Sequence, residues 1–164
     1  MKTLLISLHI MTISIFSFQL QQNQAGTATL LNSYYEVKNA LINADAEAAA
    51  AKAGQLIKAS NSYDLKTLPE AKVNAFIAIQ KSLTGDAEHI KTTKELNKQR
   101  EYFAALSQHV YAMAQLVKLS GHPVYQQYCA MKKMYWLSSE TSIKNPYYGN
   151  AMLSCGRVTE TINP

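Results

Sequence analysis

The chain contains two cysteines, and each lies close to a methionine near the carboxyl terminus. Cys129 and Met131 stand in the stretch CAMKKM, and Met152 and Cys155 stand in the stretch MLSCG. Thiolates and thioethers are soft ligands that suit Cu(I), and Ag(I) is its soft mimic. These four side chains therefore predict a soft-metal site, for which His122 is a fifth candidate ligand.

The spacing within each stretch allows its two sulfurs to face one ion. In an extended segment, residues i and i+2 point to the same side, as Cys129 and Met131 would. In a helical turn, residues i and i+3 share a face, which would let Met152 and Cys155 close the site. The pattern thus permits all four sulfurs to surround a metal.

The same cysteines have a second interpretation, a disulfide. In an exported protein, two cysteines in a tail without regular structure are commonly paired. A Cys129–Cys155 bridge would close a loop of about 25 residues and stabilise the fold by about 3 kcal/mol in the chain-entropy model. Methionines beside aromatic residues commonly fill core gaps, as we expect of Met113 and Met134. The residues leave open a metal site, a disulfide, or a pair that alternates between the two.

The amino terminus predicts a secretory signal peptide over residues 1–22. Lys2 precedes an apolar stretch that contains no acidic residue, with cleavage expected between Ser17 and Gly26. This stretch of about fifteen residues, interrupted by His9 and several hydroxyls, is shorter than the roughly twenty of a membrane-spanning helix. The leader contains no cysteine for a lipid anchor. We expect a periplasmic or secreted protein without stable membrane insertion after cleavage, and an uncleaved anchor is the alternative.

The charge distribution argues against a nucleic-acid partner. The formal net charge is +5, from sixteen basic and eleven acidic residues that are interspersed along the chain. A nucleic-acid binder would concentrate basic residues in a patch or stripe. The charge fits the solvated surface of a helical protein.

Apolar residues recur at spacings of three and four from residue 28 to residue 117, which is the period of amphipathic helices. One face of the first helix is predicted to carry Leu30, Tyr34, Val37, Leu41 and Ala44. Asp45 is the predicted N-cap of the second helix. The patterns Thr67-x-x-Glu70 and Thr92-x-x-Glu95 predict capping boxes at the third and fourth helices.

These elements predict an all-α fold, an up-and-down antiparallel four-helix bundle over residues 27–122. After Pro123 the periodicity is lost, and tyrosines, the tryptophan and both cysteines gather. Residues 123–164 are therefore predicted to form an irregular aromatic cap in the same domain.

Three stretches carry a resemblance to a known family: QREYFAALS (99–107), YQQYCAMKKMYWLS (125–138) and IKNPYYGNAMLSCG (143–156). They resemble a bacterial exported domain of unknown function. Its members occur alone or as carboxy-terminal extensions of periplasmic adaptor subunits of copper and silver efflux pumps. The family usually has proline at the position of Ala130, a difference that reduces the rigidity between Cys129 and Met131. The resemblance implies a metal-efflux adaptor, or another periplasmic protein, as partner.

Enzyme chemistry has little support in the sequence. A cysteine nucleophile needs a base close by, and His122 alone is near either cysteine in sequence. No glycine-rich phosphate loop and no His-Glu-x-x-His motif occurs. Two functions remain: a Cu(I)- or Ag(I)-handling domain linked to efflux, and a structural or protein-interaction module held by a disulfide.

Overall fold

The computed structural model of the protein describes residues 26–164. The predicted signal peptide, residues 1–22, lies outside the described residues. Within the described part, no helix is both long enough and apolar enough to cross a membrane.

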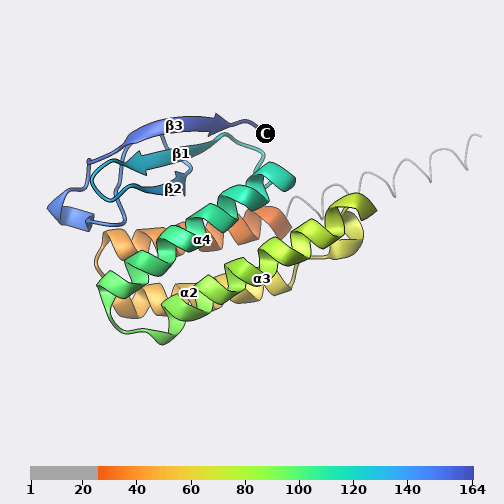
Figure 1. Ribbon diagram of the computed structural model, residues 1–164, viewed down its shortest axis with the longest axis horizontal. Helices are drawn as coiled ribbons and strands as arrows, with labels where there is room; N and C mark the ends of the chain where they lie inside the picture. The colour runs from red at the N-terminus through yellow and green to blue at the C-terminus, as the bar shows by residue number, and fades with distance from the viewer. Residues whose placement is uncertain (1–25) are drawn as a thin grey trace, which may run out of the picture.

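Four helices lie alongside one another in the described chain (Figure 1). The chain is helical over residues 26–42, and it continues through α2 (Ala46–Asn61), the short 3-10 helix η1 (Leu65–Thr67), α3 (Glu70–Thr92) and α4 (Leu96–Leu116). The predicted face of the first helix is confirmed, because its members from Leu30 to Leu41 are fully buried. Ala44 does not belong to that face. It is exposed and lies in the turn before α2, with a φ of 57°.

Of the three N-terminal helix caps predicted from the sequence, one is confirmed. The carboxylate of Asp45 accepts a hydrogen bond from the Ala48 amide (2.8 Å), as an N-cap does. The two predicted capping boxes are wrong. The hydroxyl of Thr67 donates to the Asp64 carbonyl inside η1, and that of Thr92 donates to the Glu88 carbonyl at the end of α3. Threonine hydroxyls bond readily to nearby backbone carbonyls, and here these local bonds prevail.

The predicted all-α class is also wrong, because the carboxy-terminal segment forms a three-stranded antiparallel sheet. Its strands are β1 (Val124–Cys129), β2 (Met134–Ser138) and β3 (Arg157–Ile162), in the spatial order β2-β1-β3. A second 3-10 helix, η2 (Gly149–Ala151), lies between β2 and β3. The sheet packs beside α4, with β2 in contact with that helix (Figure 1).

The strands are short and only partly alternating, which explains why no strand was predicted. Three consecutive residues of β2, Trp136 to Ser138, are buried, because both faces of this strand are covered. A strand covered on both faces loses the alternation that identifies a half-buried strand. β3 does alternate, with Val158, Glu160 and Ile162 on its less exposed side. That alternation, and the aromatic and β-branched composition, were the available signs of a sheet.

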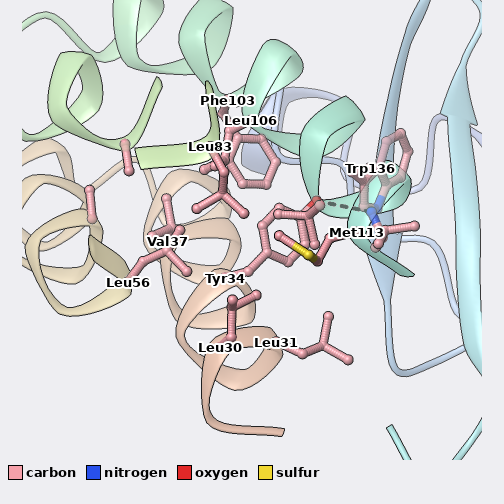
Figure 2. Packing of buried hydrophobic residues seen from close by; sticks show 14 of the residues in the cluster. Leu30, Leu31, Tyr34, Val37, Leu56, Leu83, Phe103, Leu106, Met113 and Trp136 are labelled. Carbon is pink, nitrogen blue, oxygen red and sulfur yellow. Dashed lines mark hydrogen bonds between the residues drawn. The ribbon is translucent and has the colours of Figure 1, made fainter. Parts of the chain in front are cut away.

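Tyr34 connects the sheet to the helices. Its ring is fully buried and stacks on Phe103 of α4 at a centroid distance of 5.2 Å. Figure 2 shows Tyr34 within the core, reaching toward β2. The Leu137 amide donates to the Tyr34 hydroxyl (2.9 Å), which leaves that hydroxyl free to donate to Ser107 (2.8 Å). One side chain thus joins the first helix, α4 and β2, and fixes the sheet on the bundle.

Candidate functional site

The two cysteines meet at one end of the sheet. Cys129 is the last residue of β1, and Cys155 comes two residues before the start of β3. β1 pairs with β3, with Tyr128 opposite Arg157, so the pairing carries both cysteines to the same end. Their Sγ atoms are 4.0 Å apart, and both are free thiols. Cys129 is buried and Cys155 is partly exposed, so solvent reaches the pair from one side.

Asn145 holds the segment that carries Cys155. This side chain is fully buried, with its amide donating to the Cys155 carbonyl (2.7 Å) and its oxygen accepting from the Tyr147 amide (2.8 Å). Its backbone donates to the Leu153 carbonyl and accepts from the Gly149 amide. Four bonds from one residue fix the loop 145–155, and with it the position of the second thiol.

Gly156 lets this segment approach β1 closely. Its φ is 155°, a conformation that residues with a side chain rarely adopt. A Cβ at this position would lie 2.9 Å from the indole of Trp136 and 3.0 Å from the Tyr128 carbonyl oxygen. The glycine after Cys155 therefore brings that cysteine against the strand that ends in Cys129.

The two methionines of the predicted set lie on the segments that carry the cysteines, and both are solvent-accessible. Met131 is 61% exposed in the loop 130–133 that joins β1 to β2. Met152 is 40% exposed and begins a turn that Cys155 closes, with the Cys155 amide donating to the Met152 carbonyl (3.1 Å). The loop after Cys129 is a turn and not the extended segment assumed from the spacing, and Lys133 within it has a φ of 55°.

The structure does not bring His122 to the thiol pair. His122 is exposed before the start of β1, whereas Cys129 ends that strand. The five steps from Val124 to Cys129, at about 3.3 Å each, separate the two ends of the strand by about 16 Å. His122 therefore cannot share an ion with Cys129 in this fold.

The environment of Cys155 favours its protonated thiol. Burial raises the pKa of the Cys155 thiol, and the Cys129 sulfur, through a hydrogen bond and its charge, raises that pKa further. A thiol must lose its proton to become a metal ligand, so binding at this pair would release protons. A raised pKa also lowers the thiolate fraction, and with it the reactivity toward oxidants.

One buried charge went unnoticed in the sequence. Lys38 of the first helix is only 5% exposed. Its ammonium donates to the Ser138 hydroxyl at the end of β2 (3.2 Å) and lies 5.0 Å from the centre of the Tyr35 ring. Burial lowers the pKa of Lys38 from 10.5 to about 8, and this effect exceeds the opposing attraction of Glu140. Lys38 follows Tyr34 by four residues, so both lie on the core side of the helix, and this spacing was the sign in the sequence that Lys38 is buried.

Lys38→Met is expected to stabilise the protein by about 2 kcal/mol at pH 7. A lysine whose pKa falls from 10.5 to about 8 costs the folded state about 3 kcal/mol at neutral pH, less the contacts to Ser138 and Tyr35 that methionine loses. The unfolded chain binds more protons between these two pKa values, so wild-type stability gains from rising pH in that window. The advantage of the variant should therefore shrink from pH 8 to pH 10.

Urea denaturation of both proteins at several pH values measures this difference. Lys58→Met, at an exposed position of α2, is the matched control and should change little. A stability difference for Lys38→Met that does not vary with pH would contradict the buried-charge account.

Within residues 26–164, no group of three or more His, Cys, Asp and Glu side chains is placed to hold one metal ion. The soft donors nearest to the two thiols in sequence are the thioethers of Met131 and Met152.

Comparison with known proteins identifies a family. Residues 30–122 match the model of the family described as "Protein of unknown function (DUF3347)". The matched range begins within the first helix, covers the other α-helices and ends just before β1, so the thiol pair lies beyond it. No curated protein and no solved structure matches the chain. Because the match covers more than half of the sequence, the chain belongs to the DUF3347 family of unknown function.

Proposed function

We propose that the protein, in the periplasm or outside the cell, binds Cu(I), or Ag(I) as its soft mimic, through Cys129 and Cys155. The observation that supports this proposal is the 4.0 Å separation of the two Sγ atoms. Two metal–sulfur bonds of about 2.3 Å at a tetrahedral angle place the sulfurs about 3.8 Å apart. The pair thus needs little movement to hold one ion.

The exposed thioethers of Met131 and Met152 supply further soft donors on the two segments that carry the thiols. A site that is buried on the Cys129 side and open on the Cys155 side can retain an ion and still release it to another protein. The tail motifs resemble exported domains found beside copper and silver efflux adaptors, and this context supports efflux as the setting. We infer a role in passing the metal to or from such an adaptor.

The test is a titration of the reduced protein, residues 23–164, with Cu(I) under anaerobic conditions in competition with a chromophoric Cu(I) chelator. The expected result is one tightly bound Cu(I) per chain, bound more tightly as the pH rises because the thiols must lose protons. Alkylation of both cysteines should abolish the competition. A chelator that keeps all the copper, or an affinity unchanged by alkylation, would overturn the proposal.

The short sulfur–sulfur distance also favours a second candidate, a protein-interaction module held by a disulfide. A bridge needs an S–S length of about 2.05 Å, so the sulfurs would have to approach each other by about 2 Å. A count of free thiols on the protein as exported, with and without reductant, separates the candidates. Two free thiols support the metal site, and none supports the bridge.

A further inference from the structure

A small polar cavity lies between the beginning of α4 and the loop that joins β1 to β2. Its volume is about 180 Å³. The residues that line it are Asn97, Arg100, Glu101, Lys132, Met134 and Tyr147. Since a water molecule occupies about 30 Å³ in the liquid, the cavity has room for a small ion or organic acid of about six water volumes.

Arg100 is a partly unsatisfied cation at this cavity. One terminal nitrogen of its guanidinium donates to the Leu41 carbonyl near the end of the first helix (3.1 Å). Its Nε is buried and has no hydrogen-bond partner among the described residues. Leaving a buried donor of a charged group unpaired costs free energy, and a bound acceptor would recover it. Burial also lowers the pKa of Arg100, which reflects a desolvated cation.

Lys132, in the loop that joins β1 to β2, provides the second positive charge at the cavity. Its ammonium lies 5.3 Å from the centre of the Tyr148 ring. In the described part of the chain, neither Lys132 nor Arg100 forms an ion pair with a carboxylate. Two unpaired cations that face one polar cavity create a local positive potential.

Glu101 is the one carboxylate in this wall, and it is already engaged. Lys98 lies 3.1 Å from its Oε2 and offsets its charge. Asn97, in the first turn of α4, also lines the cavity, and the helix dipole favours a negative ligand at that turn. The balance of charge around the cavity is therefore positive.

We propose that this cavity binds a small oxyanion, a phosphate or carboxylate group held between Arg100 and Lys132. Guanidinium and ammonium donors recognise these groups by charge-assisted hydrogen bonds, and Asn97 offers a further amide donor. The site uses neither cysteine, so the inference stands apart from the proposed metal binding.

The experiment is calorimetric titration of the reduced, metal-free protein with inorganic phosphate and, in a second arm, with succinate, at constant ionic strength set by sodium chloride. Saturable binding at one site per chain, in either arm, is expected, and the arm that binds more tightly identifies the preferred group. Heat that does not saturate, or that equals the effect of added chloride, would overturn the proposal.

Two neighbouring lysines provide a matched pair of variants. Lys132→Gln should weaken binding about tenfold, because one charge-assisted contact is lost. Lys133→Gln removes the same charge from the next residue, which does not line the cavity, and should leave the affinity within about twofold. Equal losses of affinity in both variants would show only a general effect of net positive charge and would refute the site. Both residues are exposed, so both variants should keep the wild-type melting temperature in chloride.

Discussion

Cys129→Ser and Cys155→Ser are each expected to weaken Cu(I) binding at least about a hundredfold. Serine keeps the shape of cysteine but replaces a soft thiolate by a hard hydroxyl that stays protonated, so one ligand is lost. Loss of a mere supporting contact around a metal site costs about 10- to 100-fold, and loss of a ligand should cost at least as much. Competition with a Cu(I) chelator measures both affinities.

Cys155→Ser is the cleaner of the two variants. Cys155 is partly exposed, whereas Cys129 is buried, where a serine hydroxyl would lack a partner and lower the stability. Thermal unfolding of each metal-free variant separates lost folding from lost binding. An affinity for Cu(I) unchanged in Cys155→Ser would exclude the thiol pair as the site.

The methionines allow a graded comparison. Met131→Leu and Met152→Leu keep volume and remove the thioether, and each should weaken binding by about tenfold if its sulfur completes the site. Met113→Leu is the matched control, because Met113 is fully buried in the helical core. A loss in the Met113 variant as large as that in the other two would point to altered packing.

The helices were predictable because their buried faces repeat every three or four residues. Spacings of four, three and four residues place one set of apolar side chains on a single face of the first helix, and all of them are fully buried: Leu30, Tyr34, Val37 and Leu41. The sheet was not predictable in the same way. β1 finds its partners in β2, which follows at once, and in β3, almost thirty residues later. The pairing of β1 with β3 depends on contacts between segments far apart in sequence, which no local pattern encodes.

The candidate site shows the same division. The sulfur residues themselves were evident in the sequence, but the closeness of Cys129 and Cys155 results from the pairing of β1 with β3, which the expected irregular cap did not include. His122 was included because it is near Cys129 in sequence, and the intervening strand is what separates the two. Sequence proximity misleads wherever the chain between two residues is extended.

The cations at the junction were the least predictable feature. Lys38 is buried and Arg100 is half-buried, whereas lysine and arginine are mostly exposed in proteins. In the structure both reach the junction between the helices and the carboxy-terminal segment: Lys38 bonds Ser138, and Arg100 lies beneath Gly149. Both side chains are covered because the sheet and its loops pack on the bundle. The helical periodicity of the sequence does not predict that packing.

The packing of this loop on the helices requires a glycine at the end of the stretch NPYYG. Gly149 has a φ of 55°, and its amide donates to the Asn145 carbonyl (2.9 Å). A Cβ at Gly149 would lie 2.6 Å from the carbonyl oxygen of Ile42, the last residue of the first helix, and 2.9 Å from the guanidinium of Arg100. The loop that precedes Cys155 thus rests directly on the backbone of the bundle, where only glycine fits.

Gly149→Ala is therefore expected to lower the free energy of unfolding by about 3 kcal/mol. The left-handed conformation costs alanine about 1 kcal/mol, and the overlap with a backbone oxygen adds about 2 kcal/mol. Gly85→Ala is the matched control of opposite sign, because Gly85 lies within α3 with nothing within 4 Å of an added Cβ. Alanine there should stabilise the protein by about 0.5–1 kcal/mol.

Urea denaturation measures both glycine variants, and Cu(I) competition on the Gly149 variant tests what the docking does for the thiols. Asn145 links Gly149 to Cys155, so a displaced loop should also displace the second thiol and weaken Cu(I) binding. If Gly149→Ala unfolds with the wild-type free energy, the loop does not dock as described. If it loses stability but keeps its Cu(I) affinity, the thiols are held by the pairing of β1 and β3 alone.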